Sequence, residues 1–118
     1  IVWCVKYRRK VLAPEIESYL KEQAQEIAKS KGFTVHLLET GNMDYVHCFV
    51  SAPPMLCITD IVKYLKGITG RRLFEKYPEL RNQLWNGQLW NHSYYCETVG
   101  DVSESTIRTY IEKQTKSY

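Results

Sequence analysis

The stretch that decides the fold is Met43-Asp44-Tyr45-Val46-His47-Cys48-Phe49-Val50-Ser51-Ala52-Pro53-Pro54. Its β-branched and aromatic residues predict a strand over residues 45–51, which the two prolines end. Side chains alternate along a strand, so the odd-numbered residues from Tyr45 to Phe49 share one face and the even-numbered residues from Val46 to Val50 share the other. We interpret the second set as core, which leaves His47 on the opposite face of a sheet. Taken alone, a histidine in this position is more often a half-buried polar residue than a ligand.

Helices and strands are predicted on both sides of this strand. The predicted elements are a strand at 1–5, a helix at 14–32, a strand at 33–39, a turn at 40–42, a second helix from its cap at Thr59, a strand at 89–99 and a last helix capped by Ser103. We expect Gly67 and Gly70 to loosen the end of the second helix. This order fits a single α+β domain over residues 1–118, of ferredoxin-like or RRM-like type, with helices packed against a mainly antiparallel sheet.

The composition is that of a globular domain, with 118 residues, 44% of them apolar and 25% charged. The sequence has neither an apolar run of about 18 residues nor a signal-peptide pattern, so we expect a cytoplasmic protein. The four cysteines form no C-x-x-C pair, which argues against a zinc module and favours reduced thiols. The chain begins within a predicted strand, so we expect a short native segment before Ile1.

Positive charge is concentrated in two blocks, Lys6–Lys10 and Lys63–Arg81, with tyrosines interleaved. Such blocks attract phosphate backbones, and neighbouring aromatic side chains stack on unpaired bases. A solvated surface of mixed charge is an equally good interpretation of the charge pattern. The aromatic residues Trp90, Tyr94 and Tyr95 are candidates for base stacking, although aromatic residues at alternate strand positions are more often core.

A second group of candidate residues lies near the C-terminus. Tyr110 and Gln114 are four residues apart on one face of the predicted last helix, where both side chains reach the same small volume. Together with His47 they suggest metal-assisted attack on a phosphate. The same spacing also fits the buried stripe of an amphipathic helix, and the spacing by itself favours that interpretation.

Several segments resemble, in their order along the chain, the single-tyrosine transposases of the HUH endonuclease superfamily. These segments are Asp44-Tyr45-Val46-His47, Leu65-Lys66-Gly67, Arg71-Arg72-Leu73-Phe74, Leu89-Trp90, Thr98-Val99-Gly100-Asp101 and Tyr110-Ile111-Glu112-Lys113-Gln114. The resemblance implies an enzyme that nicks and rejoins single-stranded DNA, with a hairpin at the ends of an insertion sequence, through a 5′-phosphotyrosine intermediate. It also implies a homodimer whose tyrosine helices complete one another's active sites.

Residue by residue, the resemblance makes Tyr110 the nucleophile and His47 and Gln114 ligands of a divalent ion, Mg²⁺ or Mn²⁺. Tyr45 stands where the family has its first histidine. A phenol with a pKa of about 10 is a poor ligand, so we treat Tyr45 as a further candidate ligand and expect low metal affinity. The bond energy is retained in the phosphotyrosine, so no nucleotide cofactor is required.

Six basic residues are the candidates for contacts with DNA phosphates: Arg8, Arg9, Lys63, Lys66, Arg71 and Arg72. The alternative to an active transposase is a single-stranded nucleic-acid-binding domain whose catalysis has decayed. The reason for this alternative is that Tyr45 stands where the family has its first histidine.

Overall fold

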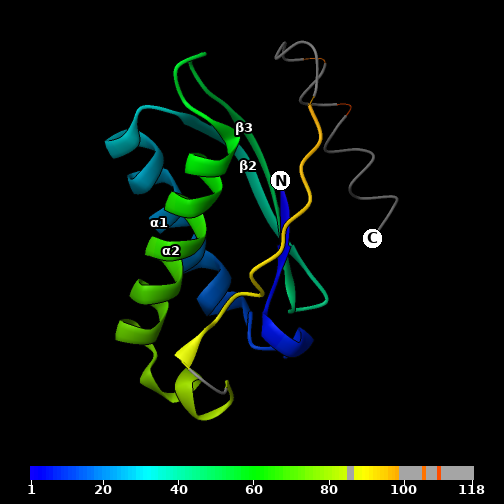
Figure 1. The fold of residues 1–118 in the computed structure, drawn as a ribbon. Helices are drawn as coiled ribbons and strands as arrows, with labels where there is room; N and C mark the ends of the chain where they lie inside the picture. Colours follow the sequence, from blue (N-terminus) through cyan, green and yellow to red (C-terminus); the bar gives the residue numbers. More distant parts are fainter. Residues whose placement is uncertain (85–86, 99–104, 106–108, 110–118) are drawn as a thin grey trace.

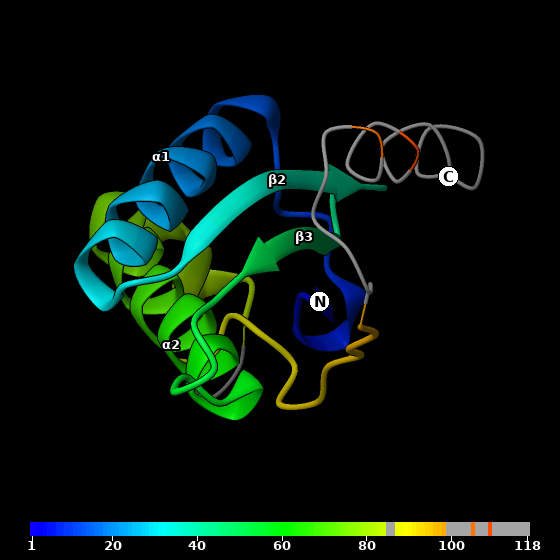
Figure 2. The same ribbon diagram turned by 90° about the horizontal axis from the view of Figure 1, so that it is seen from above.

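A three-stranded sheet with two helices on one face organises the described chain (Figure 1). The computed structural model describes residues 1–84, 87–98, 105 and 109. Its elements are β1 (Val2–Cys4), the 3-10 turn η1 (Lys6–Arg8), α1 (Pro14–Lys31), β2 (Thr34–Gly41), β3 (Tyr45–Ser51), α2 (Ile58–Lys76) and the 3-10 turn η2 (Pro78–Asn82). The strands are antiparallel in the order β1-β3-β2, and α1 and α2 lie on the same side of them (Figure 2). The predicted α+β fold is therefore confirmed. Of the predicted last helix, the structure describes only Ser105 and Thr109, both in helical conformation.

Helix α1 forms as predicted because its sequence has a favourable first residue, a terminating glycine and an apolar face. Pro14 lies in the first turn, where its missing N–H costs nothing. Gly32 takes a left-handed φ of 84° and donates its N–H to the carbonyl of Ala28, which closes the C-terminus. The buried face carries Ile16, Leu20, Gln23, Ala24, Ile27 and Ala28. No helix within the described ranges combines the length and the apolar character needed to cross a bilayer.

The β2–β3 hairpin is confirmed, but its turn comes two residues later than predicted. β2 continues to Gly41, which pairs with Tyr45. The turn is made by Asn42 and Met43, with φ of 52° and 60°, and the N–H of Asp44 donates to the carbonyl of Gly41 at 3.1 Å. Two successive positive φ values match the right-handed twist of the two strands. Gly41 was predicted to be a turn residue but is part of the ladder.

The strand predicted over residues 89–99 is wrong in its extent. Among the described residues, this segment meets β1 at one isolated bridge, Val2 with Tyr95, and the residue after β1 at another, Val5 with Trp90. Trp90 belongs to the core, since its ring packs edge-on against Trp3 at 5.7 Å and its Nε1 donates to Thr69 Oγ1 at 3.1 Å. The interpretation of Trp90 as a base-stacking residue is therefore wrong.

Helix α2 is longer than predicted at both ends. It begins after Cys57, so that Thr59 lies within the first turn and does not cap the helix. It also continues through Gly67 and Gly70, because the buried residues Leu73 and Phe74 beyond them hold the last turns on the core. Gly70 lies beside Trp90, and a Cβ added there would make an ordinary van der Waals contact with Trp90 Cδ1 at 3.4 Å. Tertiary burial therefore outweighs the weak helix propensity of the two glycines.

The variant Gly67→Ala is expected to raise the free energy of unfolding by about 0.5–1 kcal/mol, because alanine loses less backbone entropy in a helix. A Cβ at Gly67 meets no atom within 4 Å. Urea denaturation measures the change. The matched variant is Gly70→Ala, whose Cβ would lie at an ordinary van der Waals distance of 3.4 Å from Trp90 Cδ1, so its gain should be at least as large. A loss of stability in either variant would contradict the assignment of both glycines to positions with room for a Cβ.

Candidate active site

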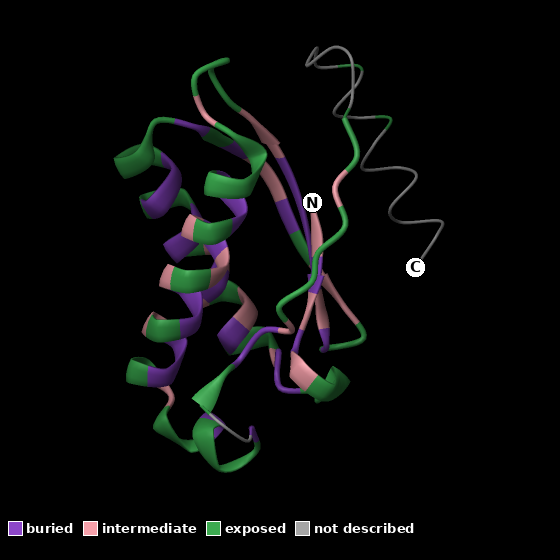
Figure 3. Ribbon diagram, in the orientation of Figure 1, coloured by how far each residue is buried: buried purple, intermediate pink, exposed green. Residues whose placement is uncertain are grey.

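His47 lies on the face of the sheet opposite the helices, as its strand parity predicts. Its neighbours Val46 and Cys48 are fully buried in the core, which defines the other face. Across the sheet His47 is directly opposed by Val2 of β1 and Glu39 of β2. The side chain is itself only 7% exposed, and buried residues extend along β3 (Figure 3). Burial, together with the nearby amino group of Ile1, lowers the pKa of His47 to about 4. The imidazole is therefore neutral at neutral pH, which is the form that binds metals.

The stability of the protein is expected to fall as the pH is lowered from about 6.5 to about 4. Within this window the unfolded chain binds a proton at His47 that the folded protein excludes, so acid favours unfolding by up to about 3 kcal/mol. Chemical denaturation at a series of pH values with a chelator present measures the slope. His47→Gln should flatten the slope, whereas His92→Gln, at an exposed position, should retain it. An unchanged slope in His47→Gln would contradict the attribution of this pH dependence to His47.

Tyr45 packs across the hairpin. A Cβ added at Gly41 would overlap the Cζ and Oη atoms of Tyr45, so the phenol ring lies directly over Gly41 of β2. An aromatic ring that covers a cross-strand glycine shields the backbone and fixes the register. The guanidinium of Arg8 lies 6.0 Å from the centre of the same ring. This geometry favours a packing role for Tyr45 over a role as a metal ligand.

Asp44, next to Tyr45, is held by Arg8. Its carboxylate is 3% exposed and accepts hydrogen bonds from Arg8 Nε at 3.0 Å, Arg8 Nη2 at 3.3 Å and Asn42 Nδ2 at 3.3 Å. A buried carboxylate that is paired in this way anchors η1 to the hairpin turn. On the partner strand, His36 Nε2 lies 2.8 Å from Ser51 Oγ. Asp44 and His36, two further residues of metal-binding types in this hairpin, therefore both have partners within the chain.

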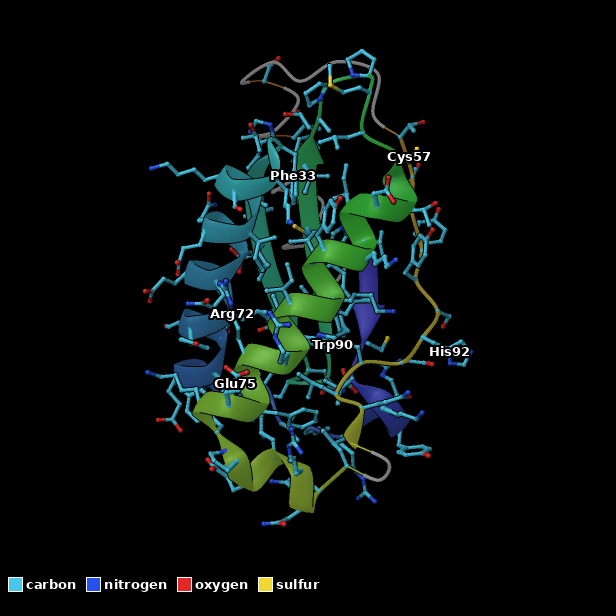
Figure 4. The ribbon with its side chains drawn as sticks, turned by 60° about the vertical axis from the view of Figure 1, so that its left-hand side comes forward. Phe33, Cys57, Arg72, Glu75, Trp90 and His92 are labelled. Carbon is cyan, nitrogen blue, oxygen red and sulfur yellow. The ribbon has the colours of Figure 1, made fainter. Side chains whose placement is uncertain are left out.

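Three of the six predicted phosphate contacts also make bonds within the protein. Arg8 binds Asp44, Arg72 Nη1 donates to Gln23 Oε1 of α1 at 2.5 Å, and Lys66 Nζ donates to the carbonyls of Asn91 at 2.5 Å and Ser93 at 3.2 Å. Figure 4 shows Arg72 between α2 and α1. These bonds indicate structural roles for Arg72 and Lys66, whereas the side chain of Arg8 stays 58% exposed.

The other three basic candidates, Arg9, Lys63 and Arg71, are exposed. Lys63 and Arg71 belong to α2, which covers the face of the sheet opposite to His47 (Figure 1). The structure divides the predicted DNA-binding residues between two sides of the molecule.

Tyr110 and Gln114 lie outside the described residues. Within the described part of the chain, no group of three or more histidine, cysteine, aspartate or glutamate side chains could hold a metal ion. Glu39, which opposes His47 in the register, was missed by the sequence analysis. Its carboxylate lies 3.7 Å from Lys21 Nζ of α1. A correct register count from the hairpin turn would have found it.

The comparisons with known proteins agree with one another. Residues 1–114 match the family model described as IS200-like transposase. The chain is 44% identical over 114 residues to the ISDra2 transposase TnpA of Deinococcus radiodurans, an alignment that covers 97% of this chain and 81% of that protein. It is 29% identical to the transposase for insertion sequence element IS200 of Salmonella typhimurium, with coverage of 97% and 74%. A crystal structure of a proposed transposase from Deinococcus radiodurans superimposes with a TM-score of 0.77 at 41% identity, with coverage of 96% and 86%.

Proposed function

Because the chain belongs to the IS200-like transposase family, and is thus an enzyme that acts on DNA, we propose that it cleaves and rejoins single-stranded DNA at the ends of an insertion sequence. The proposed nucleophile is Tyr110. The observation that carries the proposal is His47, a neutral imidazole on the face of the sheet away from the helices. The family match covers residues 1–114 and therefore includes Tyr110 and Gln114.

The proposed chemical step is a transesterification. The phenolic oxygen of Tyr110 attacks phosphorus, the bond from phosphorus to the 3′ oxygen breaks, and the proton lost by the phenol is balanced by the one gained by the released 3′-hydroxyl. The product is a 5′-phosphotyrosine. Attack by a 3′-hydroxyl on this linkage reverses the step and rejoins the strand, so neither oxidant nor nucleotide is consumed.

The residues proposed to hold a divalent ion are His47 and Gln114. The neutral imidazole of His47 and the amide oxygen of Gln114 fit Mg²⁺ or Mn²⁺ as donors, with water completing the shell. Tyr45 does not fit as a third donor because its ring lies over Gly41. When bound, the ion would neutralise charge on the phosphate. A site with two protein donors is expected to bind its ion weakly.

Arg8 and Arg9 are the proposed phosphate contacts near the reacting group, since both belong to the segment that follows β1. Lys63 and Arg71 are proposed to contact a more distant part of the DNA, such as the hairpin. We also propose a homodimer in which the tyrosine helix of each subunit completes the site of the other. The support for these partners is the family relationship together with the separation of the basic residues onto two sides.

The proposed function is tested by a covalent trapping assay. The protein is incubated with single-stranded oligonucleotides from insertion-sequence ends that carry a label on the 3′ side of the nick, with Mg²⁺ or Mn²⁺. The expected result is a labelled band that migrates with the protein under denaturing conditions and requires the ion. Salt-dependent binding without any adduct, over a range of end sequences and ion concentrations, would instead support a decayed binding domain.

A further inference from the structure

A row of four residues crosses the sheet on the face that carries His47. Tyr95 opposes Val2, Val2 opposes His47, and His47 opposes Glu39. Directly opposed residues of antiparallel strands project from the same face. Neighbouring strands are about 4.8 Å apart, so the backbones of Tyr95 and His47 are separated by roughly 10 Å. An aromatic side chain therefore shares the face of the proposed reaction centre, two strand spacings away from His47.

Tyr95 lies opposite Val2 because the segment that contains Tyr95 has a bulge. Between the bridges Val5–Trp90 and Val2–Tyr95, the N-terminal segment advances by three residues (5 − 2) and the opposing segment by five (95 − 90). The segment therefore contains two extra residues, and without them Ser93 would oppose Val2. A bulge re-aims side chains in this way and occurs often beside functional sites. The result is that tyrosine takes the position that serine would otherwise occupy.

Lys66 holds the bulge in place from α2. Its ammonium group donates hydrogen bonds to the carbonyls of Asn91 and Ser93, two residues of the bulge. A buried or half-buried carbonyl that has lost its ladder partner needs such a donor. The bulge exposes His92, which points away from the core in Figure 4.

We propose that Tyr95 stacks on the base of a nucleotide next to the phosphate at which the strand is cut. Its side chain is 62% exposed, so a ring face is accessible. A stacking base must be unpaired, which agrees with a single-stranded substrate and allows contact at any base type. The inference rests on the proposed function, because the position of the phosphate follows from His47. Lys66 is a positioning residue for this contact, since it fixes the bulge that sets the register of Tyr95.

The test is a double-mutant cycle between protein and DNA. Affinity for a single-stranded end oligonucleotide is measured by fluorescence anisotropy, with an abasic site moved through the nucleotides that flank the cut. In the wild type, one abasic position is expected to weaken binding about tenfold. Tyr95→Ala should cause a similar loss with intact DNA, and the same abasic site should then cost Tyr95→Ala little more. Tyr95→Phe should bind like the wild type, because stacking does not need the hydroxyl group.

Two further variants separate stacking from other effects. Lys66→Met should reduce affinity by weakening the bulge while leaving the salt dependence of binding nearly unchanged, whereas loss of a phosphate contact would lower the salt slope by about one. Lys66→Arg should restore part of the affinity.

The inference is overturned if the abasic penalties in the wild type and in Tyr95→Ala are equal, whatever their size. Because the scan with wild-type protein needs no variant, a flat scan would also overturn it even if Tyr95→Ala failed to fold. Both results would leave the covalent trapping assay unaffected, so failure of this inference can be told apart from failure of the proposed function.

Discussion

Tyr110→Phe is expected to abolish the covalent protein–DNA adduct and to slow strand cleavage by at least about 10³-fold, since removing the nucleophile of a serine protease costs of the order of 10⁶. The substitution removes the attacking oxygen and keeps the ring, so packing around the position is preserved. Affinity for the oligonucleotide should stay within about threefold of the wild type. The measurement is the labelled adduct under denaturing conditions, with binding followed separately by anisotropy.

The control for Tyr110→Phe is Tyr118→Phe, which removes a phenol from the same C-terminal region and should leave the adduct intact. An adduct that persists in Tyr110→Phe and disappears in Tyr118→Phe would move the nucleophile to Tyr118. Mixing Tyr110→Phe with His47→Ala subunits tests the proposed dimer. Recovery of cleavage in the mixture requires a site assembled from two subunits, whereas two inactive proteins that stay inactive indicate a site within one subunit.

The strongly periodic parts of the fold could be predicted from the sequence. The apolar spacing from Ile16 to Ala28 specifies α1, and alternation along β3 places Val46 in the core and His47 on the opposite face. In both cases a long buried surface determines the structure, so local pattern and tertiary packing agree.

Two of the errors concern glycines that lie within a strand or helix in the structure. Gly41 was assigned to the hairpin turn, a placement that would pair His47 with Val35 instead of Glu39. The ring of Tyr45 over Gly41 is what keeps this glycine in the ladder. Gly67 and Gly70 were assigned to a helix end, although the buried residues Leu73 and Phe74 hold the helix on the core beyond them. Such contacts join residues that are not neighbours in sequence, so no local pattern shows them.

In the candidate site, too, some residues could be identified from a local sequence pattern and others depend on tertiary contacts. Strand parity was sufficient to find His47. The partners of Arg8, Lys66 and Arg72 depend on which carbonyl or carboxylate the fold brings near them, so a count of positive charges could not separate structural cations from exposed ones. The bulge at residues 91–94, and with it the position of Tyr95, follows from Lys66 reaching across from α2.

Tyr45→His is expected to raise the apparent affinity for Mn²⁺ by at least about tenfold, and to increase cleavage at limiting Mn²⁺ by a similar factor. Residues 45 and 47 project from the same face of β3, so a second imidazole would stand beside that of His47 and add a nitrogen donor to a site with few protein ligands. Titration calorimetry measures the affinity, and the trapping assay at a series of Mn²⁺ concentrations measures the activity.

Tyr45→Phe is the matched control for this substitution, because it removes the phenolic oxygen and retains the ring over Gly41. If Tyr45 packs and does not bind the ion, Tyr45→Phe should match the wild type in metal dependence, and only Tyr45→His should gain. Loss of activity in Tyr45→Phe without a gain in Tyr45→His would make the phenol a ligand. If the wild type and both variants bind single-stranded DNA but form no adduct, Tyr45 is not what silences the chemistry, because restoring the histidine then fails to restore cleavage. The comparison thus separates a weak but competent metal site from a domain that has kept binding and lost catalysis.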